Sequence, residues 1–175
     1  MLQPVDFAVA FVASYLKREE GMWSPARIRE VVPMPWASLH LSLSRLEAAD
    51  VVRDGRVHSL ALSALLPALR YLVPARVDLG ADLVLGVPTG VSAPAFGDAI
   101  VMSAPMVWPS ERGSVLGLAV QPLHPVIPEA VLQNPGAYAV LAALDAVRTG
   151  KAREFAAGAR LLEALVDVHL PQLAA

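Results

Sequence analysis

The chain has 175 residues, enough for one domain of ordinary size or two small ones, and its lack of cysteine excludes disulfides and thiolate metal sites. Hydrophobic residues make up 55% of the chain and charged residues 17%, but no segment approaches the roughly 18 unbroken apolar residues that span a bilayer. The net charge of −2 argues against general affinity for nucleic acid, although residues 1–76 carry nine Lys or Arg against seven Asp or Glu.

The apolar excess is spread along the whole chain. Because so few charges are available for a small surface, we expect apolar surface to be buried against another subunit or a partner. Asp6 interrupts the first apolar stretch and residues 17–20, Lys-Arg-Glu-Glu, close it, which is not the pattern of an export signal. We therefore expect a cytoplasmic protein that does not enter a membrane.

Two helices are predicted first along the chain. Apolar residues recur at helical spacing over residues 4–19, and Gly21 stands where a glycine would end that helix. Ser24 then precedes a proline, which is the typical start of a capped helix, so residues 26–32 are predicted as a short second helix.

A third helix is predicted to open at Pro35 and to run over residues 35–49. Leu39, Leu43 and Leu46 follow the i, i+4, i+7 spacing of a core stripe, so the opposite side of this helix should face outward.

A tight hairpin and a fourth helix should follow. Residues 53–56, Arg-Asp-Gly-Arg, contain the Asp-Gly pair that supplies the positive φ angles of a two-residue turn. Ser59 is predicted to cap a helix that reaches about Val73 and is interrupted by Pro67. Three helices, a hairpin and a helix are the order of a winged helix-turn-helix, which we predict for residues 1–75.

The middle of the chain is rich in proline and is predicted as an extended wrap with one short β-hairpin. Residues 86–90 read as coil, residues 100–102 and 115–120 as short strands, and residues 110–113 as a turn before the second strand.

The last 40 residues return to helix. Asn134 should cap a helix that ends at Thr149 and Gly150, and residues 151–169 should form another, antiparallel to it. The predicted fold is therefore mainly α with minor β: a winged helix-turn-helix over 1–75, then a proline-rich wrap and a helical hairpin over 76–175 that serve dimerisation or partner binding.

The third helix of this arrangement can lie in the major groove of DNA, and the hairpin can touch the minor groove or a phosphate. We therefore expect double-stranded DNA to be contacted by residues of the second helix, the third helix and the hairpin. The predicted contacts are Arg27, Arg29, Trp36, Ser38, His40, Leu41, Ser44, Arg45, Arg53 and Arg56. For three of these residues an alternative to DNA contact stays open. Trp36 could instead pack under the hairpin as core, and Arg53 and Arg56 could only solubilise the hairpin tip.

The stretch over residues 36–52 resembles the recognition helix and first wing strand of MarR-like regulators, and Arg45-Leu46-Glu47 followed by a small residue is similar to that family's helix exit. The resemblance covers residues 5–73 and implies operator binding by a homodimer. This chain has fewer cations on the helix and a shorter wing than the family pattern.

Residues 86–89, 93–94, 107–109 and 117–128, with the closing helices, are similar to a group of uncharacterised bacterial winged-helix proteins. Some of that group act as antitoxin-like partners of nucleotidyltransferase-type proteins, so the resemblance implies a cognate toxin or a nucleotidyltransferase-like partner.

Enzyme signatures are weak in this sequence, and we expect neither catalysis nor a cofactor. The four histidines are far apart, none has a metal-ligand residue three or four positions after it, and no nucleophile-elbow or phosphate-loop motif occurs. Asp78 with Asp82, and Asp98 with Glu111, are carboxylate pairs in predicted loops. Two functions follow: a homodimeric DNA-binding transcriptional regulator, or an antitoxin-like module that inhibits a cognate enzyme and represses its own operon.

Overall fold

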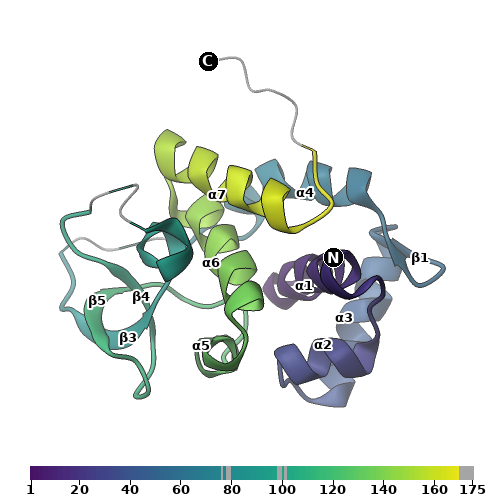
Figure 1. The fold of residues 1–175 in the computed structure, drawn as a ribbon, viewed down its shortest axis with the longest axis horizontal. Coiled ribbons are helices and arrows are strands. Elements are labelled where there is room, and N and C mark those ends of the chain that lie inside the picture. Colours follow the sequence, from purple (N-terminus) through teal and green to yellow (C-terminus); the bar gives the residue numbers. More distant parts are fainter. Residues whose placement is uncertain (76, 78–79, 98–99, 101, 170–175) are drawn as a thin grey trace.

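The computed structural model describes residues 1–75, 77, 80–97, 100 and 102–169, and within them the chain is mainly helical with two small sheets (Figure 1). Helices α1 (Pro4–Glu20) and α6 (Pro135–Thr149) lie side by side in the middle. Helices α2 (Pro25–Val31) and α3 (Trp36–Ala48) lie on one side of this pair, and a small β-barrel lies on the other.

The first three helices are confirmed at the predicted places, with ends that differ by at most one residue from the predicted bounds. Gly21 closes α1 with φ of 79°, in the left-handed region. Ser24 caps α2 by accepting a hydrogen bond from the backbone N–H of Arg27. The helical spacing of the apolar residues over 4–19 predicts an amphipathic helix with one buried face, which is wrong in part. Helix α1 is buried on all sides between Asp6 and Ser14, because α6 covers what would otherwise be its outer side.

The predicted turn is confirmed between strands β1 (Val52–Arg53) and β2 (Arg56–Val57), which pair antiparallel. Asp54 and Gly55 both have positive φ, 52° and 69°, as a two-residue turn that follows the strand twist requires.

Helix α4 (Ser59–Leu72) differs from the prediction in two details. Ser59 is its first residue rather than its cap; His58 holds the cap position without a side-chain hydrogen bond. Pro67 does not interrupt the helix, because Leu62, Leu66 and Leu69 on its inner side are all fully buried and hold it in place.

The middle of the chain forms a three-stranded closed barrel instead of coil with a hairpin. Its strands are β3 (Val84–Pro88), β4 (Met106–Pro109) and β5 (Val115–Ala119). Strand β3 is antiparallel to both others, and β4 runs parallel to β5. Gly86 pairs with both neighbours and lies so close to the Trp108 carbonyl that a side chain would not fit. Residues 86–88 were predicted as coil, which is wrong: they belong to strand β3. Their hydrogen-bonding partners lie more than 15 residues away, so the local sequence does not indicate the strand.

Other expectations for this region have mixed outcomes. The strand predicted over 115–120 is confirmed as β5, and the turn before it is confirmed by a hydrogen bond of 3.0 Å from the Gly113 N–H to the Ser110 carbonyl. For the strand predicted over 100–102, Val101 lies outside the described residues, and Ile100 and Met102 belong to no strand. Short helical turns complete the region: η1 (Gly90–Ser92), η2 (Pro94–Phe96), α5 (Ile127–Ala130) and η3 (Val131–Gln133).

Helix α6 begins at the predicted cap, where the Asn134 side chain accepts a hydrogen bond from the Ala137 N–H. It is connected by two residues to α7 (Ala152–Leu165), and Gly158 lets the two helices approach closely. The prediction that this last helix reaches residue 169 is wrong. The helix ends at Leu165 and Val166 has an extended backbone; the Arg18 guanidinium donates to the Val166 carbonyl, and the Ser14 hydroxyl accepts from the Asp167 N–H.

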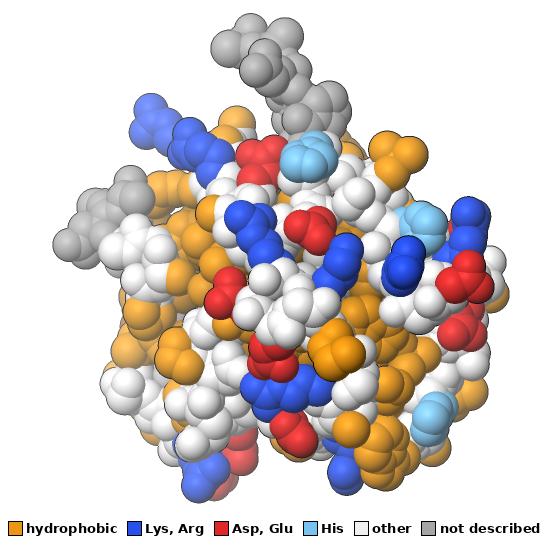
Figure 2. Space-filling view, turned by 45° about the vertical axis from the view of Figure 1, so that its right-hand side comes forward, with side chains coloured by type: hydrophobic (Ala, Val, Ile, Leu, Met, Phe, Trp, Pro, Cys, Tyr) orange, Lys and Arg blue, Asp and Glu red, His pale blue; other side chains and the backbone are white. Residues whose placement is uncertain are grey.

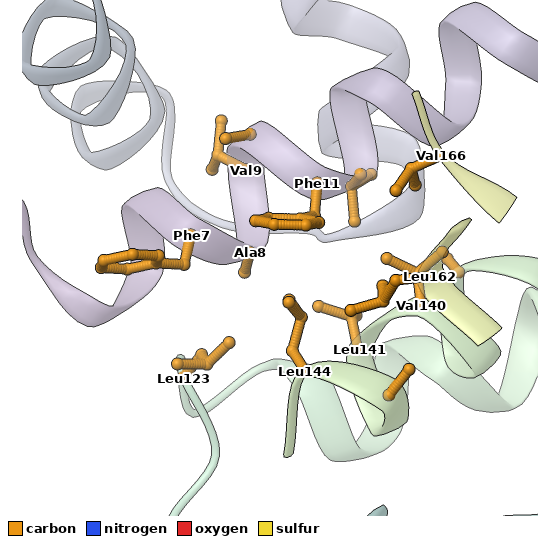
Figure 3. Packing of buried hydrophobic residues seen from close by; sticks show 14 of the residues in the cluster. Phe7, Ala8, Val9, Phe11, Leu123, Val140, Leu141, Leu144, Leu162 and Val166 are labelled. Atoms are coloured by element: carbon orange, nitrogen blue, oxygen red, sulfur yellow. The ribbon is translucent and has the colours of Figure 1, made fainter. Parts of the chain in front are cut away.

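The core runs through both predicted domains without a break. Ala8 and Phe11 of α1 face Leu141 and Leu144 of α6, and Phe7 lies on the side of Leu123 (Figure 3). The boundary predicted near residue 75 stays a prediction, but the two sides of it share one hydrophobic cluster.

A buried ion pair between Asp145 and Arg148 ties the barrel to the helices. The Asp145 carboxylate is 1% exposed and accepts hydrogen bonds from Thr89 Oγ1 at 2.9 Å, Trp108 Nε1 at 2.5 Å and Arg148 Nη1 at 2.5 Å. Arg148 also donates to the carbonyls of Val73 and Gln121. Burial raises the pKa of the Asp145 carboxyl, and its three hydrogen-bond donors oppose that rise.

Removal of either charge should therefore leave the other buried without its partner. We expect Arg148→Met to lower the free energy of unfolding by about 3–5 kcal/mol, as is typical when one member of a buried ion pair is removed. Urea denaturation followed by circular dichroism measures this. The matched control is Asp167→Asn, which removes an exposed ion pair with Lys17 and should cost at most about 1 kcal/mol. Equal losses of unfolding free energy in the two variants would contradict the structural role of the buried Asp145–Arg148 pair.

Candidate nucleic-acid interface

Helix α3 buries one side and leaves the other open, as its leucine spacing predicts. Leu39, Leu43 and Leu46 are buried against α1 and α2. Ala37, Leu41, Ser44 and Ala48, at spacings of four and three, form the outermost stripe and are all exposed. This stripe, which we call the α3 stripe, contains no charged side chain.

Arg29, Trp36 and His40 form a cluster along one edge of the α3 stripe. The Arg29 guanidinium lies 5.1 Å from the centre of the Trp36 ring, and the His40 ring stacks on Trp36 at 5.7 Å. Arg29 also donates from Nε to the Met34 carbonyl at 3.0 Å. Trp36 is 43% exposed and does not pack under the hairpin as core, which was one of the two alternatives.

Arg45 lies along the other edge, where it binds Asp6 of α1. Its Nε and Nη2 each donate to one carboxylate oxygen at 2.7 Å, and Asp6 also accepts from the backbone N–H of Gln3. Asp6 is fully buried, and its hydrogen bonds raise the pKa of Arg45. The guanidinium predicted to contact DNA is thus held by a structural ion pair between α1 and α3.

Two further arginines predicted at the interface are also paired with carboxylates. Arg27 binds Glu20 of α1 and Glu30 of its own helix, and Arg53 binds Asp50 at the start of the hairpin. In the described part of the chain, Arg56 at the hairpin tip forms no ion pair. Figure 2, which turns the α3 side forward, shows acidic and basic side chains intermixed rather than a continuous basic patch.

A pocket of about 300 Å³ opens between α1, α3 and the segment that follows β5. Ser38, Leu41 and Arg45 line it from α3, and Leu123 and His124 line it from the far part of the chain. Burial lowers the pKa of the His124 imidazole, so this residue is neutral at pH 7 and adds no positive charge. Sequence reasoning missed both residues, because nothing local to them indicates that they reach α3.

Within the described residues no three His, Asp or Glu side chains lie close enough to hold a metal ion. The carboxylate pairs considered from the sequence include Asp78 and Asp98, which lie outside those residues. No described helix is long and apolar enough to cross a membrane.

Comparison of the chain with protein-family models, curated proteins and solved structures finds no match. The likeness to MarR-like regulators therefore stays a prediction.

Loss of Arg45 should destabilise the fold whether or not DNA is present. Arg45→Met leaves the Asp6 carboxylate buried without its main partner; because Arg45 is itself 28% exposed, we expect a loss of about 2–3 kcal/mol, below the usual range for a buried pair. The matched control is Arg56→Met, expected to change stability by less than about 0.5 kcal/mol. Thermal or urea unfolding measures both, and a fully stable Arg45→Met protein would refute the structural role.

Proposed function

We propose that the protein is a DNA-binding transcriptional regulator, in which residues 1–75 form a winged helix-turn-helix and two copies act together. The observation that carries this proposal is the position of α3: it follows α2 after a short turn, buries its leucines inward and leaves the α3 stripe open beside a two-residue hairpin. This is the arrangement that lets a helix enter the major groove while the hairpin touches the backbone.

The uncharged α3 stripe favours contacts of shape and hydrogen bonding over charge. Ser44 and His40 can bond base edges or phosphates, and the Leu41 side chain can pack on a thymine methyl group. Arg29 and Arg56 are the two predicted contacts whose charge no carboxylate within the described residues offsets. One copy therefore has few cations for phosphates, and useful affinity requires a second copy on the same DNA.

This proposal predicts a shallow dependence of DNA binding on salt. A dimer with two free arginines per copy should give a plot of log K against log salt with a slope of about −4, since each neutralised phosphate contributes roughly −0.9. Fluorescence anisotropy with the DNA upstream of the protein's own gene measures the slope.

Arg29→Gln or Arg56→Gln should each reduce that slope by about 2 in the dimer, because each removes one phosphate contact per copy. Arg160→Gln, which removes an exposed arginine from α7, is the control and should leave the slope unchanged. Absence of binding at low salt to any fragment would refute DNA binding, and an equal effect of Arg160→Gln would refute the proposed surface.

A second function is favoured by exposed leucines on the barrel. Leu85 and Leu116 stand opposite each other on β3 and β5 and are 44% and 59% exposed, and Leu83 beside them is 48% exposed. A cluster of exposed leucines on a sheet is typical of a protein-binding surface. We infer from it an antitoxin-like role, in which the barrel binds a nucleotidyltransferase-like enzyme encoded beside this protein.

Co-expression with the product of the adjacent gene tests this second function. The pair should co-purify, and the double change Leu85→Asp and Leu116→Asp should weaken the complex at least about 100-fold, because it places charges in an apolar contact. Leu132→Asp, at another exposed leucine, should leave the complex intact. A protein that purifies alone, or loss of the complex in the Leu132 control, would count against binding through the barrel.

A further inference from the structure

The outer side of α4 is the most apolar helix face that the described residues leave uncovered. While Leu62, Leu66 and Leu69 point into the core, Leu60, Tyr71 and Leu72 are 83%, 77% and 61% exposed. Alanines fill the space between them along the same side. We call this surface the α4 face; it consists of Leu60, Ala61, Ala64, Ala68, Tyr71 and Leu72.

The α4 face offers no free charge to a partner. Arg70 is the one charged residue of the helix, and the chain itself holds its guanidinium. That group lies 5.5 Å from the Tyr71 ring centre and 5.6 Å from that of Phe155 on α7, and it donates to the Gly150 carbonyl. An acidic or basic partner would find no counter-charge here, whereas two copies of the face can meet without repulsion between like charges.

The order of side chains along the α4 face is nearly the same read in either direction. Large residues stand at both ends and alanines in the middle, placed evenly about residue 66. When two such helices lie antiparallel across a two-fold axis at residue 66, Leu60 of one meets Leu72 of the other. Ala64 of one then meets Ala68 of the other, so the backbones can approach closely at the centre while the large side chains fill the ends. Self-complementarity of this kind is what a two-fold interface requires.

We propose that a second copy of this chain docks on the α4 face, with the two α4 helices antiparallel about residue 66. The proposal deepens the proposed function, because it names the surface that joins the two copies on DNA, but self-association can be measured without DNA. A 14-residue helix is about 21 Å long, so the interface is at the small end of specific interfaces and the dimer should dissociate in roughly the micromolar range.

Sedimentation velocity over a range of protein concentrations tests the association. The unaltered protein should pass from monomer to dimer as its concentration rises through the micromolar range, and the double change Leu60→Glu and Leu72→Glu should keep it monomeric. Leu132→Glu is the matched control, because Leu132 is 44% exposed and lies on η3, away from the α4 face; this variant should dimerise normally. A monomer at every concentration, or a dimer that resists the α4 changes, would overturn the proposal.

Cysteine cross-linking tests the antiparallel register, since the natural chain has no cysteine to interfere. A mixture of Ala64→Cys and Ala68→Cys proteins should form a disulfide-linked heterodimer on mild oxidation, in higher yield than either protein alone, because the Cα atoms must come within about 7 Å. Ala48→Cys, at the exposed end of α3, is the control and should not cross-link. Equal yields from all combinations would refute the register. If the dimer forms in this register but does not bind DNA, the proposed function is refuted and the docking on the α4 face stands.

Discussion

Burial of the Asp145 carboxylate next to Arg148 is the constraint on which the arrangement of this fold depends. A carboxylate removed from water must find all its hydrogen bonds inside the protein, and here Thr89 and Trp108 supply them from the barrel side. Arg148 extends the network to the carbonyls that follow α4 and β5. One ion pair on α6 thereby fixes the barrel, the end of α4 and the segment that leads to the pocket beside α3.

That constraint explains why a distant segment reaches the candidate interface. Gln121 is held by Arg148, and Leu123 and His124, two and three residues further on, line the pocket with Ser38 and Leu41. The α3 side is consequently built by both halves of the chain rather than by residues 1–75 alone.

Local patterns predicted the helices and the hairpin, because their signals lie within a few residues: Gly21 and Ser24 at helix ends, and Asp54-Gly55 in the turn. The barrel was missed, because its close contacts join segments that are distant in sequence. Gly86 and Gly113 lack side chains and so allow these segments to approach each other, and no neighbouring residue indicates this. The leucine spacing of α3 predicted which of its positions are exposed, such as Ser44, but not that Arg27, Arg45 and Arg53 are paired with carboxylates. Nothing near Arg45 in the sequence indicates that Asp6, 39 residues earlier, would take its guanidinium.

The central claim is that two copies present their α3 helices to one DNA duplex. Distance measurement by pulsed electron paramagnetic resonance tests it most directly, with a spin label on a cysteine introduced at Ala49, which is exposed, directly follows α3 and lies outside the α3 stripe. In the presence of the DNA from upstream of the protein's own gene, the distances between the labels of the two copies should centre at about 34 Å, which is one turn of B-DNA. Absence of coupling between labels on DNA-bound protein, or a separation that no whole number of turns can match, would contradict the account.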